Sequence, residues 1–117
     1  MVWACVPRVD GDPVFSALLD NEGFDSKTAK GFWAIELEDC ASISQHYIRN
    51  TPILVTRLSD NRGNSCDVID FCPRHRAKGR MYRPVAFTRI VRPVSGSPRI
   101  RVRLRPTTAW NAEAVPI

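Results

Sequence analysis

The chain has 117 residues, enough for one domain with a modest hydrophobic core, and its 44% hydrophobic and 25% charged residues exclude a wholly disordered protein. The net charge of +5 is unevenly distributed, because residues 1–60 carry five Lys or Arg against nine Asp or Glu, whereas residues 61–117 carry twelve against three. No apolar run reaches the about 18 residues of a membrane-spanning helix, and the first nine residues lack the pattern of a signal peptide, so we expect a cytoplasmic protein.

The first elements are expected to be a short buried strand over residues 2–6, a charged turn, and a short helix over residues 13–20. Asp12 is placed to cap this helix, and Pro13 is placed at its first position, where a missing N–H costs nothing. Residues 20–30 are polar and show no period, which predicts a surface loop.

From residue 32 the apolar residues recur with a period of two, which is typical of strands. In residues 32–38, Trp33, Ile35 and Leu37 alternate with Ala34, Glu36 and Glu38. Further strands are predicted over residues 42–49, 52–58, 65–71, 85–92 and 99–105, with turns over residues 59–64 and 93–98. Many short strands and one helix predict a mainly β fold, an antiparallel β-sandwich with one short α-helix near the N-terminus, as a single domain over residues 1–117.

Residues 2–20, VWACVPRVDGDPVFSALLD, form the most specific motif of the chain. The segment resembles the start of bacterial family 15 glycoside hydrolases, the glucoamylase and trehalase-like proteins, whose usual form is close to PRFDGDPVF followed by ALL. Val9 replaces the usual Phe, which exchanges one apolar residue for another. The matching positions are Pro7, Arg8, Asp10, Gly11, Asp12, Pro13, Val14, Phe15 and Ala17 to Leu19.

The resemblance continues in order through GFWAIELED at 31–39, YIRNTPILVTRL at 47–58, DVIDFCPR at 67–74 and RIVRPVSGSPRIRVRLRP at 89–106. In that family these blocks belong to the noncatalytic amino-terminal β-sandwich, and a later all-helical barrel hydrolyses α-glucosidic bonds with inversion. The resemblance therefore implies an incomplete sandwich, truncated at both ends and inactive alone, with the helical catalytic domain as its partner. Exposed strand edges are also expected to favour self-association.

Arg8, Asp10 and Asp12 are the candidate site residues, because they crowd a short turn between a strand and a helix. An Arg–Asp pair in such a turn can present planar hydrogen-bonding edges to the hydroxyls of an α-glucoside at the rim of the substrate pocket, or to another domain. The alternative is structural: Asp12 caps the helix, and Arg8 with Asp10 closes the turn.

Two basic segments have both a functional and a structural interpretation. One strand face carries Arg99, Arg101, Arg103 and Arg105. These arginines either bind the phosphates of a nucleic acid or form ion pairs with Glu36 and Glu38. The ion pairs are favoured, because no aromatic residue interrupts the face to stack bases. Residues 74–83, RHRAKGRMYR, are predicted to be a loop that is solvated, contacts an anionic partner or docks on another domain; a solvated loop is favoured.

The four cysteines, at positions 5, 40, 66 and 72, predict reduced, packed thiols. Cys66, Cys72 and His75 are the only candidate metal ligands, and their spacing fits no common zinc pattern, so neither a metal nor another cofactor is expected. Cys66 and Cys72 share strand parity with Val68, which favours a core position for both. Asp70 has the same parity, and an ion pair with Arg89 or Arg74 is its predicted role.

Two other functions remain open at this stage. A stand-alone carbohydrate-binding module would need an exposed aromatic platform from Trp3, Trp33 or Trp110. A basic nucleic-acid-binding domain would shift DNA or RNA in a gel in a salt-dependent manner.

Overall fold

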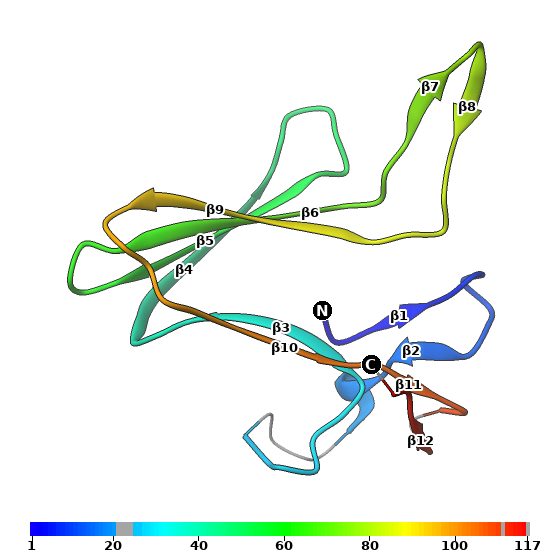
Figure 1. Cartoon of the computed structure of the whole chain (residues 1–117), viewed down its shortest axis with the longest axis horizontal. Coiled ribbons are helices and arrows are strands. Elements are labelled where there is room, and N and C mark those ends of the chain that lie inside the picture. Colours follow the sequence, from blue (N-terminus) through cyan, green and yellow to red (C-terminus); the bar gives the residue numbers. More distant parts are fainter. Residues whose placement is uncertain (21–24, 111, 117) are drawn as a thin grey trace. The chain divides into compact units, whose positions relative to one another are not determined.

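The computed structural model describes residues 1–20, 25–110 and 112–116, which are mainly antiparallel strands (Figure 1). The predicted mainly β, sandwich-like fold class is confirmed. The strands fall into two compact units, Met1–Ile35 with Val102–Ile117, and Glu36–Arg101. The first is called the terminal unit below, and the second the central unit. The single domain over residues 1–117 stays a prediction.

The central unit contains a four-stranded antiparallel sheet in the order β4-β5-β6-β9. Its strands are β4 (Cys40–Tyr47), β5 (Leu54–Asp60), β6 (Ser65–Phe71) and β9 (Thr88–Ser95). All four were predicted within a few residues, and β6 has the predicted bounds. The strand predicted over residues 85–92 begins and ends later as β9, whose Pro93 is tolerated because β9 is an edge strand.

The core of the central sheet lies around β5 and β6. Leu58 of β5 lies opposite Cys66 of β6, and both are buried, as is Val68 on the same face of β6. The packed thiol predicted at Cys66 is confirmed, whereas the packed thiol predicted at Cys40 is wrong, because Cys40 is exposed. The core position predicted for Cys72 is wrong, because β6 ends at Phe71 and the alternation of faces ends with it; Cys72 is exposed.

Residues 75–82 are a hairpin and not the predicted loop. Strands β7 (His75–Ala77) and β8 (Arg80–Tyr82) pair antiparallel around Lys78 and Gly79, whose φ angles of 49° and 73° suit a two-residue hairpin turn. The hairpin projects beyond the end of the four-stranded sheet (Figure 1), and all six of its strand residues are exposed. Its apolar pattern is too short to mark strands in the sequence, although Lys78-Gly79 is a usable turn signal.

The terminal unit has short strands and one helical turn. Its elements are β1 (Ala4–Cys5), β2 (Pro13–Phe15), the 3-10 turn η1 (Ala17–Leu19), β11 (Thr107–Thr108) and β12 (Glu113–Ala114). β1 pairs with β2, and β11 pairs with β12. Buried Phe15, Phe32 and Thr107 form its core. Of the loop predicted over residues 20–30, residues 21–24 lie outside the described residues.

The α-helix predicted over residues 13–20 is wrong. Pro13 and Phe15 are buried in strand β2, paired with β1, and only the three residues of η1 are helical. Ser16 precedes the turn without a side-chain capping bond, and Asp12 lies before β2 and caps nothing. Eight residues are too few for a stable helix on their own, so the burial of alternate residues against β1 decides the conformation.

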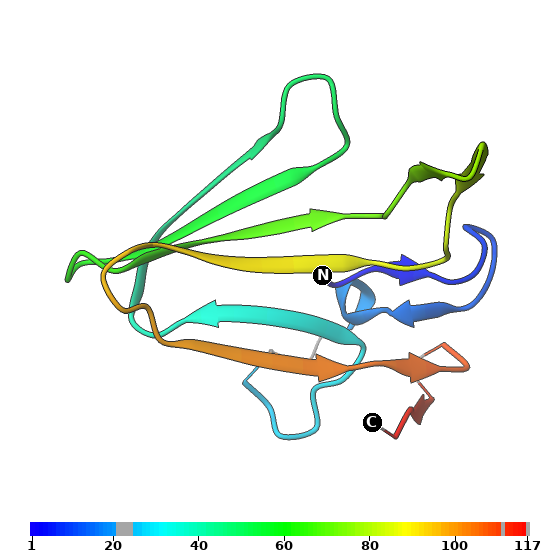
Figure 2. The same cartoon turned by 45° about the horizontal axis from the view of Figure 1, so that its top comes forward.

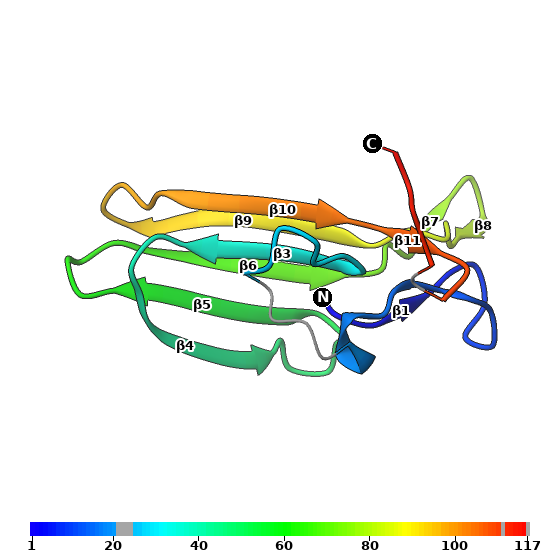
Figure 3. The same cartoon turned by 90° about the horizontal axis from the view of Figure 1, so that it is seen from below.

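Strands β3 (Phe32–Leu37) and β10 (Ile100–Arg105) pair as a two-stranded ribbon, and each contributes residues to both units. The Gly31 N–H donates to the Arg105 carbonyl at 2.7 Å, and the Glu38 N–H donates to the Arg99 carbonyl at 2.9 Å, which makes the pair antiparallel. Figure 2 shows the two strands side by side, and Figure 3 shows β4, β5 and β6 in the order that they have in the four-stranded sheet.

Candidate functional site

The charged turn of the terminal unit brings together two of its three predicted site residues. Arg8 donates from Nε and Nη2 to the two carboxylate oxygens of Asp10 at 3.0 and 2.9 Å. The Gly11 N–H closes the turn on the Arg8 carbonyl at 3.0 Å, and a Cβ at Gly11 would lie only 3.2 Å from the same oxygen. Asp12 is exposed and takes no part in the pair.

This forked pair is well exposed, with 77% of the Arg8 side chain and 65% of the Asp10 side chain accessible. The geometry suits the structural interpretation, a pair that closes the turn, and it leaves part of the guanidinium available to a partner. Contact of Arg8, Asp10 or Asp12 with substrate or with another domain stays a prediction.

Two tryptophans of the terminal unit form an exposed aromatic surface. Trp3 and Trp110 are 40% and 59% exposed, and their ring centroids lie 6.3 Å apart with a 52° angle between the planes. Trp33 is half-buried and packs against Phe15 with a centroid distance of 6.5 Å, so it offers no comparable platform. All three tryptophans are candidates from the sequence, but no local pattern in it indicates that the rings of Trp3 and Trp110 are in contact.

A pocket of about 210 Å³ adjoins this surface and is lined by Ser16, Leu19, Asp20 and Trp110. Ser16 is 5% exposed, and its hydroxyl has no hydrogen-bond partner among the described residues. Trp110 follows Ala109 in a turn in which both residues have positive φ, 49° and 55°. A hydroxyl, a carboxylate and an indole beside one small pocket are the groups that bind polyhydroxylated ligands.

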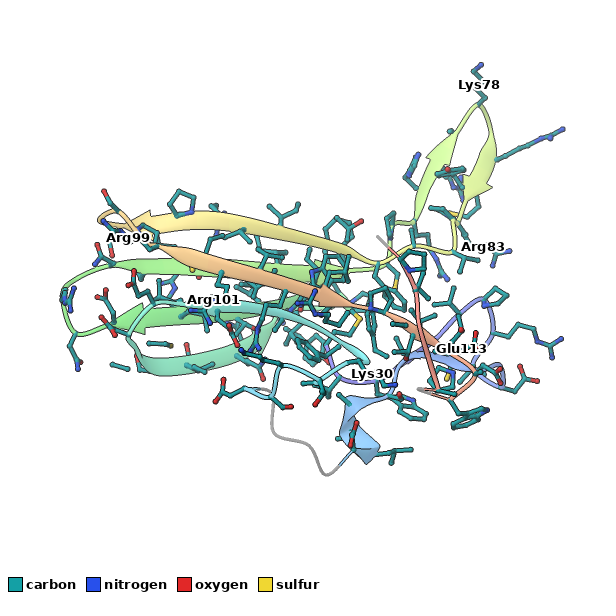
Figure 4. The ribbon with its side chains drawn as sticks, turned by 60° about the horizontal axis from the view of Figure 1, so that its bottom comes forward. Lys30, Lys78, Arg83, Arg99, Arg101 and Glu113 are labelled. Carbon is teal, nitrogen blue, oxygen red and sulfur yellow. The ribbon has the colours of Figure 1, made fainter. Side chains whose placement is uncertain are left out.

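Acidic side chains neutralise only part of the positive charge of the four alternating arginines over residues 99–105. Arg99 reaches Glu38 at 4.0 Å, and with 86% and 61% of the two side chains exposed this pair adds little stability. Arg101, which Figure 4 shows within β10, forms no ion pair with any described residue. In the terminal unit, the Arg103 guanidinium carbon lies 5.2 Å from the centre of the buried Phe32 ring, which is a cation–π contact.

Asp67 forms an ionic network across three strands that the sequence analysis missed. Its carboxylate is 1% exposed and accepts bonds from Arg57 Nε at 2.7 Å, Arg57 Nη2 at 2.9 Å and Arg92 Nη2 at 3.0 Å. These bonds, Arg57 foremost, lower the pKa of Asp67 to about 2. The arginines lie directly opposite Asp67 on β5 and β9, so the signal appears only when the strand register is known.

Asp70 and Arg89 form the ion pair predicted from strand parity. Arg89 donates from Nε at 2.7 Å and from Nη2 at 3.1 Å to the two oxygens of Asp70, its direct cross-strand neighbour. The side chains are 9% and 21% exposed for Arg89 and Asp70, so this pair is far less hydrated than those on the surface. Arg74, the other predicted partner of Asp70, forms no ion pair with it.

The carboxylate of Asp60 organises the β5–β6 turn. It accepts the backbone N–H groups of Arg62 and Asn64 at 2.8 and 2.9 Å and the Asn64 side-chain amide at 2.7 Å. These hydrogen bonds, the Asn64 amide first, lower the pKa of Asp60. Asp60 therefore acts as a turn-forming group.

The described ranges, 1–20, 25–110 and 112–116, contain neither a metal-binding cluster nor a membrane-spanning helix. The candidate set of Cys66, Cys72 and His75 is not brought together there, and no other group of His, Cys, Asp or Glu in those ranges could hold a metal ion. The same ranges contain no helix of the length and apolar character needed to cross a bilayer.

Comparison with known proteins identifies the family. Searches of the curated proteins and of the solved structures gave no significant match. The family model described as "Trehalase-like, N-terminal" matches residues 1–117, in agreement with the five sequence blocks. The chain therefore belongs to the trehalase-like N-terminal domain family.

Proposed function

We propose that the chain serves as the noncatalytic N-terminal β-sandwich of a glucoamylase- or trehalase-like glycoside hydrolase, whose separate helical domain cleaves α-glucosidic bonds with inversion. The family match over residues 1–117 carries this proposal. Inverting hydrolysis needs a carboxylic acid with a raised pKa opposite a carboxylate base. Among the described carboxylates, Asp60 and Asp67 have lowered pKa values, and Asp70 is held by Arg89, which supports a structural role for these groups.

Apolar side chains on the surface of the central unit support a partner domain. Ile90 and Val94, four residues apart on the edge strand β9, are 45% and 43% exposed. Exposed apolar groups of this kind mark interaction surfaces when they are contiguous. We infer that a helical catalytic domain covers part of this surface and that the β strands support it.

The direct test is hydrolysis by the purified chain. We expect no glucose release from maltose or trehalose above the rate without protein, because the carboxylate pair that hydrolysis requires lies in the other domain. An active trehalase added to the same samples is the control for inhibitors. Glucose release by the chain alone, retained after repurification, would contradict the proposal.

Self-association through a strand edge is a further part of this proposal. β4 is an edge strand, all eight of its residues are exposed, and it has no Lys, Arg or Pro to block pairing. We expect the apparent mass in light scattering to rise with concentration, and Ile43→Lys to suppress the rise. Val9→Lys adds the same charge at a residue that is 93% exposed outside the strands, and should leave association unchanged. A monomer at all concentrations would contradict this expectation.

A second candidate function is carbohydrate binding by the terminal unit, favoured by the exposed Trp3–Trp110 surface beside the Ser16 pocket. Calorimetric titration with trehalose or maltotriose should give saturable binding. Trp110→Ala should weaken it by about tenfold, because the stacking surface is lost. Leu18→Ala is the matched control, since Leu18 is 64% exposed and does not line the pocket. Absence of binding, or equal losses in both variants, would remove this candidate.

A cytoplasmic location is also proposed. Cys5, Cys40, Cys66 and Cys72 are all free thiols, which suits a reducing compartment. Recovery of the protein in the periplasmic fraction of its host would contradict this location.

A further inference from the structure

One pocket of the central unit lies where three connections meet at the end of the four-stranded sheet. It has a volume of about 590 Å³ and is formed by the β4–β5 connection, the segment after β6, and the segment between β8 and β9. This volume falls within the range of about 300 to 1,000 Å³ that is usual for small-molecule sites. Its walls are largely apolar, with Ile53, Phe71, Pro73 and Pro84 among them, and two arginines, Arg74 and Arg83, are its charged lining residues.

The two arginines lie at the base of the β7–β8 hairpin. The last described pair of the hairpin is His75 opposite Tyr82, and their rings are in contact with a centroid distance of 5.0 Å. Arg74 and Arg83 are the next residues beyond this pair, on the side away from the hairpin turn. Both arginines line this one pocket, so two like charges border the same cavity, which is unfavourable without a counter-ion.

No described carboxylate forms an ion pair with either of these two arginines. Arg74 and Arg83 form no ion pair, and no acidic residue lines the pocket. Five other arginines of the same unit each contact an Asp or Glu, namely Arg57, Arg62, Arg89, Arg92 and Arg99, whereas Arg101 resembles the pocket arginines in forming no ion pair with a described residue.

The backbone beside the pocket arginines is stiff. Pro84 directly follows Arg83 and restricts the dihedral angles of that arginine, and Pro73, which directly precedes Arg74, has a fixed φ of its own. Restriction of this kind lowers the entropy lost when a ligand is bound. The two guanidinium groups are therefore presented from a partly preorganised frame.

We propose that this pocket binds a small organic anion. Its carboxylate or phosphate group lies between Arg74 and Arg83, and its apolar body packs against Phe71, Ile53 and the prolines. The forked guanidinium donors match both oxyanions. A bare inorganic anion would leave the apolar walls exposed, whereas a nucleic acid would also contact the cations at the hairpin tip, where Figure 4 shows Lys78 pointing away from the sheet.

The test is titration of the whole isotope-labelled chain by NMR, with phenyl phosphate and benzoate as probes. Inorganic phosphate and phenol represent the two halves of the first probe. We expect saturable shifts at the pocket residues, with an aryl anion binding about tenfold more tightly than either half. The stronger of the two aryl probes then identifies the preferred oxyanion, and either order supports the proposal.

Single-residue variants distinguish binding in the pocket from a general attraction of the anion to the basic surface. Arg74→Gln and Arg83→Gln should each weaken binding by about tenfold, because each removes charge-assisted hydrogen bonds. Lys78→Gln removes the same charge from the tip of the same hairpin and should change affinity by less than about twofold, as expected for a distant exposed charge. All three side chains are exposed, and unchanged melting temperatures would verify their folding.

Four outcomes would overturn the proposal. These are the absence of saturable shifts with both aryl anions, shifts confined to other surfaces, inorganic phosphate binding as tightly as phenyl phosphate, and an equal loss of affinity in the Lys78→Gln variant. If a single-stranded oligonucleotide displaces the probe and itself depends on Lys78, the surface binds nucleic acid and not a small organic anion.

Discussion

Replacing Asp70 with Asn is expected to lower the free energy of unfolding by about 3 kcal/mol, the lower end of the range for breaking a buried ion pair, because both side chains are largely shielded from water. Arg89 is only 9% exposed and donates two hydrogen bonds to the Asp70 carboxylate. An amide cannot accept both bonds or neutralise the guanidinium. Denaturant unfolding of the two proteins at neutral pH measures the difference.

A double variant distinguishes this mechanism from a general loss of packing. The variant with both Asp70→Leu and Arg89→Met contains no unpaired charge and should recover most of the lost stability. Asp39→Asn is the matched control, because Asp39 pairs with Arg62 on the surface with 62% and 76% of the side chains exposed. Its cost should stay below about 1 kcal/mol. Equal losses at Asp70 and Asp39 would contradict the proposed cost of a buried charge.

Replacing Asp67 with Asn should have the next largest effect, about 2 kcal/mol at neutral pH, and should also change the acid sensitivity of the protein. Asp67 is 1% exposed, but its partners Arg57 and Arg92 are 47% and 62% exposed, so solvent screening keeps this cost below that at Asp70.

The sign of the pH effect follows from the lowered pKa of Asp67. The carboxylate titrates at about 2 in the folded chain, against the ordinary value of 3.8. Its stabilising contribution is therefore complete above about pH 5 and is lost as the pH falls through about 4 to 2. Thermal melts across this range should show a steeper loss for the wild type than for Asp67→Asn. Part of the slope should remain in the variant, because the pKa of Asp60 is lowered as well.

Asp10→Asn is a control for surface carboxylates in the same experiment. Asp10 is 65% exposed and pairs with Arg8 in the charged turn, and its replacement should leave the acid slope close to that of the wild type. Parallel slopes for the wild type and Asp67→Asn would show that the three-strand network does not cause acid sensitivity.

Several features could be predicted from the sequence because they depend on local patterns. Alternation of apolar and polar residues predicted the strand over residues 65–71 at the bounds of β6. Strand parity predicted that Asp70 would pair with Arg89 or Arg74, and Arg89 is the partner. In the charged turn, residues two apart were enough to predict the Arg8–Asp10 pair. The motif blocks identified the family, since order and spacing along the chain are properties of the sequence itself.

Other features could not be predicted, because they depend on which strands become neighbours. Asp67 meets Arg57 and Arg92 only through the register of β5, β6 and β9, which local alternation does not specify. Trp3 and Trp110 are more than one hundred positions apart, and only the fold of the terminal unit places their rings side by side. The helix expected over residues 13–20 gave way to β2, since pairing with β1 outweighed weak local helix signals.

The sequence by itself determined the fold class, the family, the positions of the main strands and the reduced state expected of the cysteines. Only the tertiary structure decided the partners of the shielded charges, the pocket that both Arg74 and Arg83 line, and the exposure of Cys72. The physical reason is range: backbone alternation and turn chemistry act over a few residues, whereas register, burial and ion pairing between strands are set by contacts that the chain makes only when it is folded.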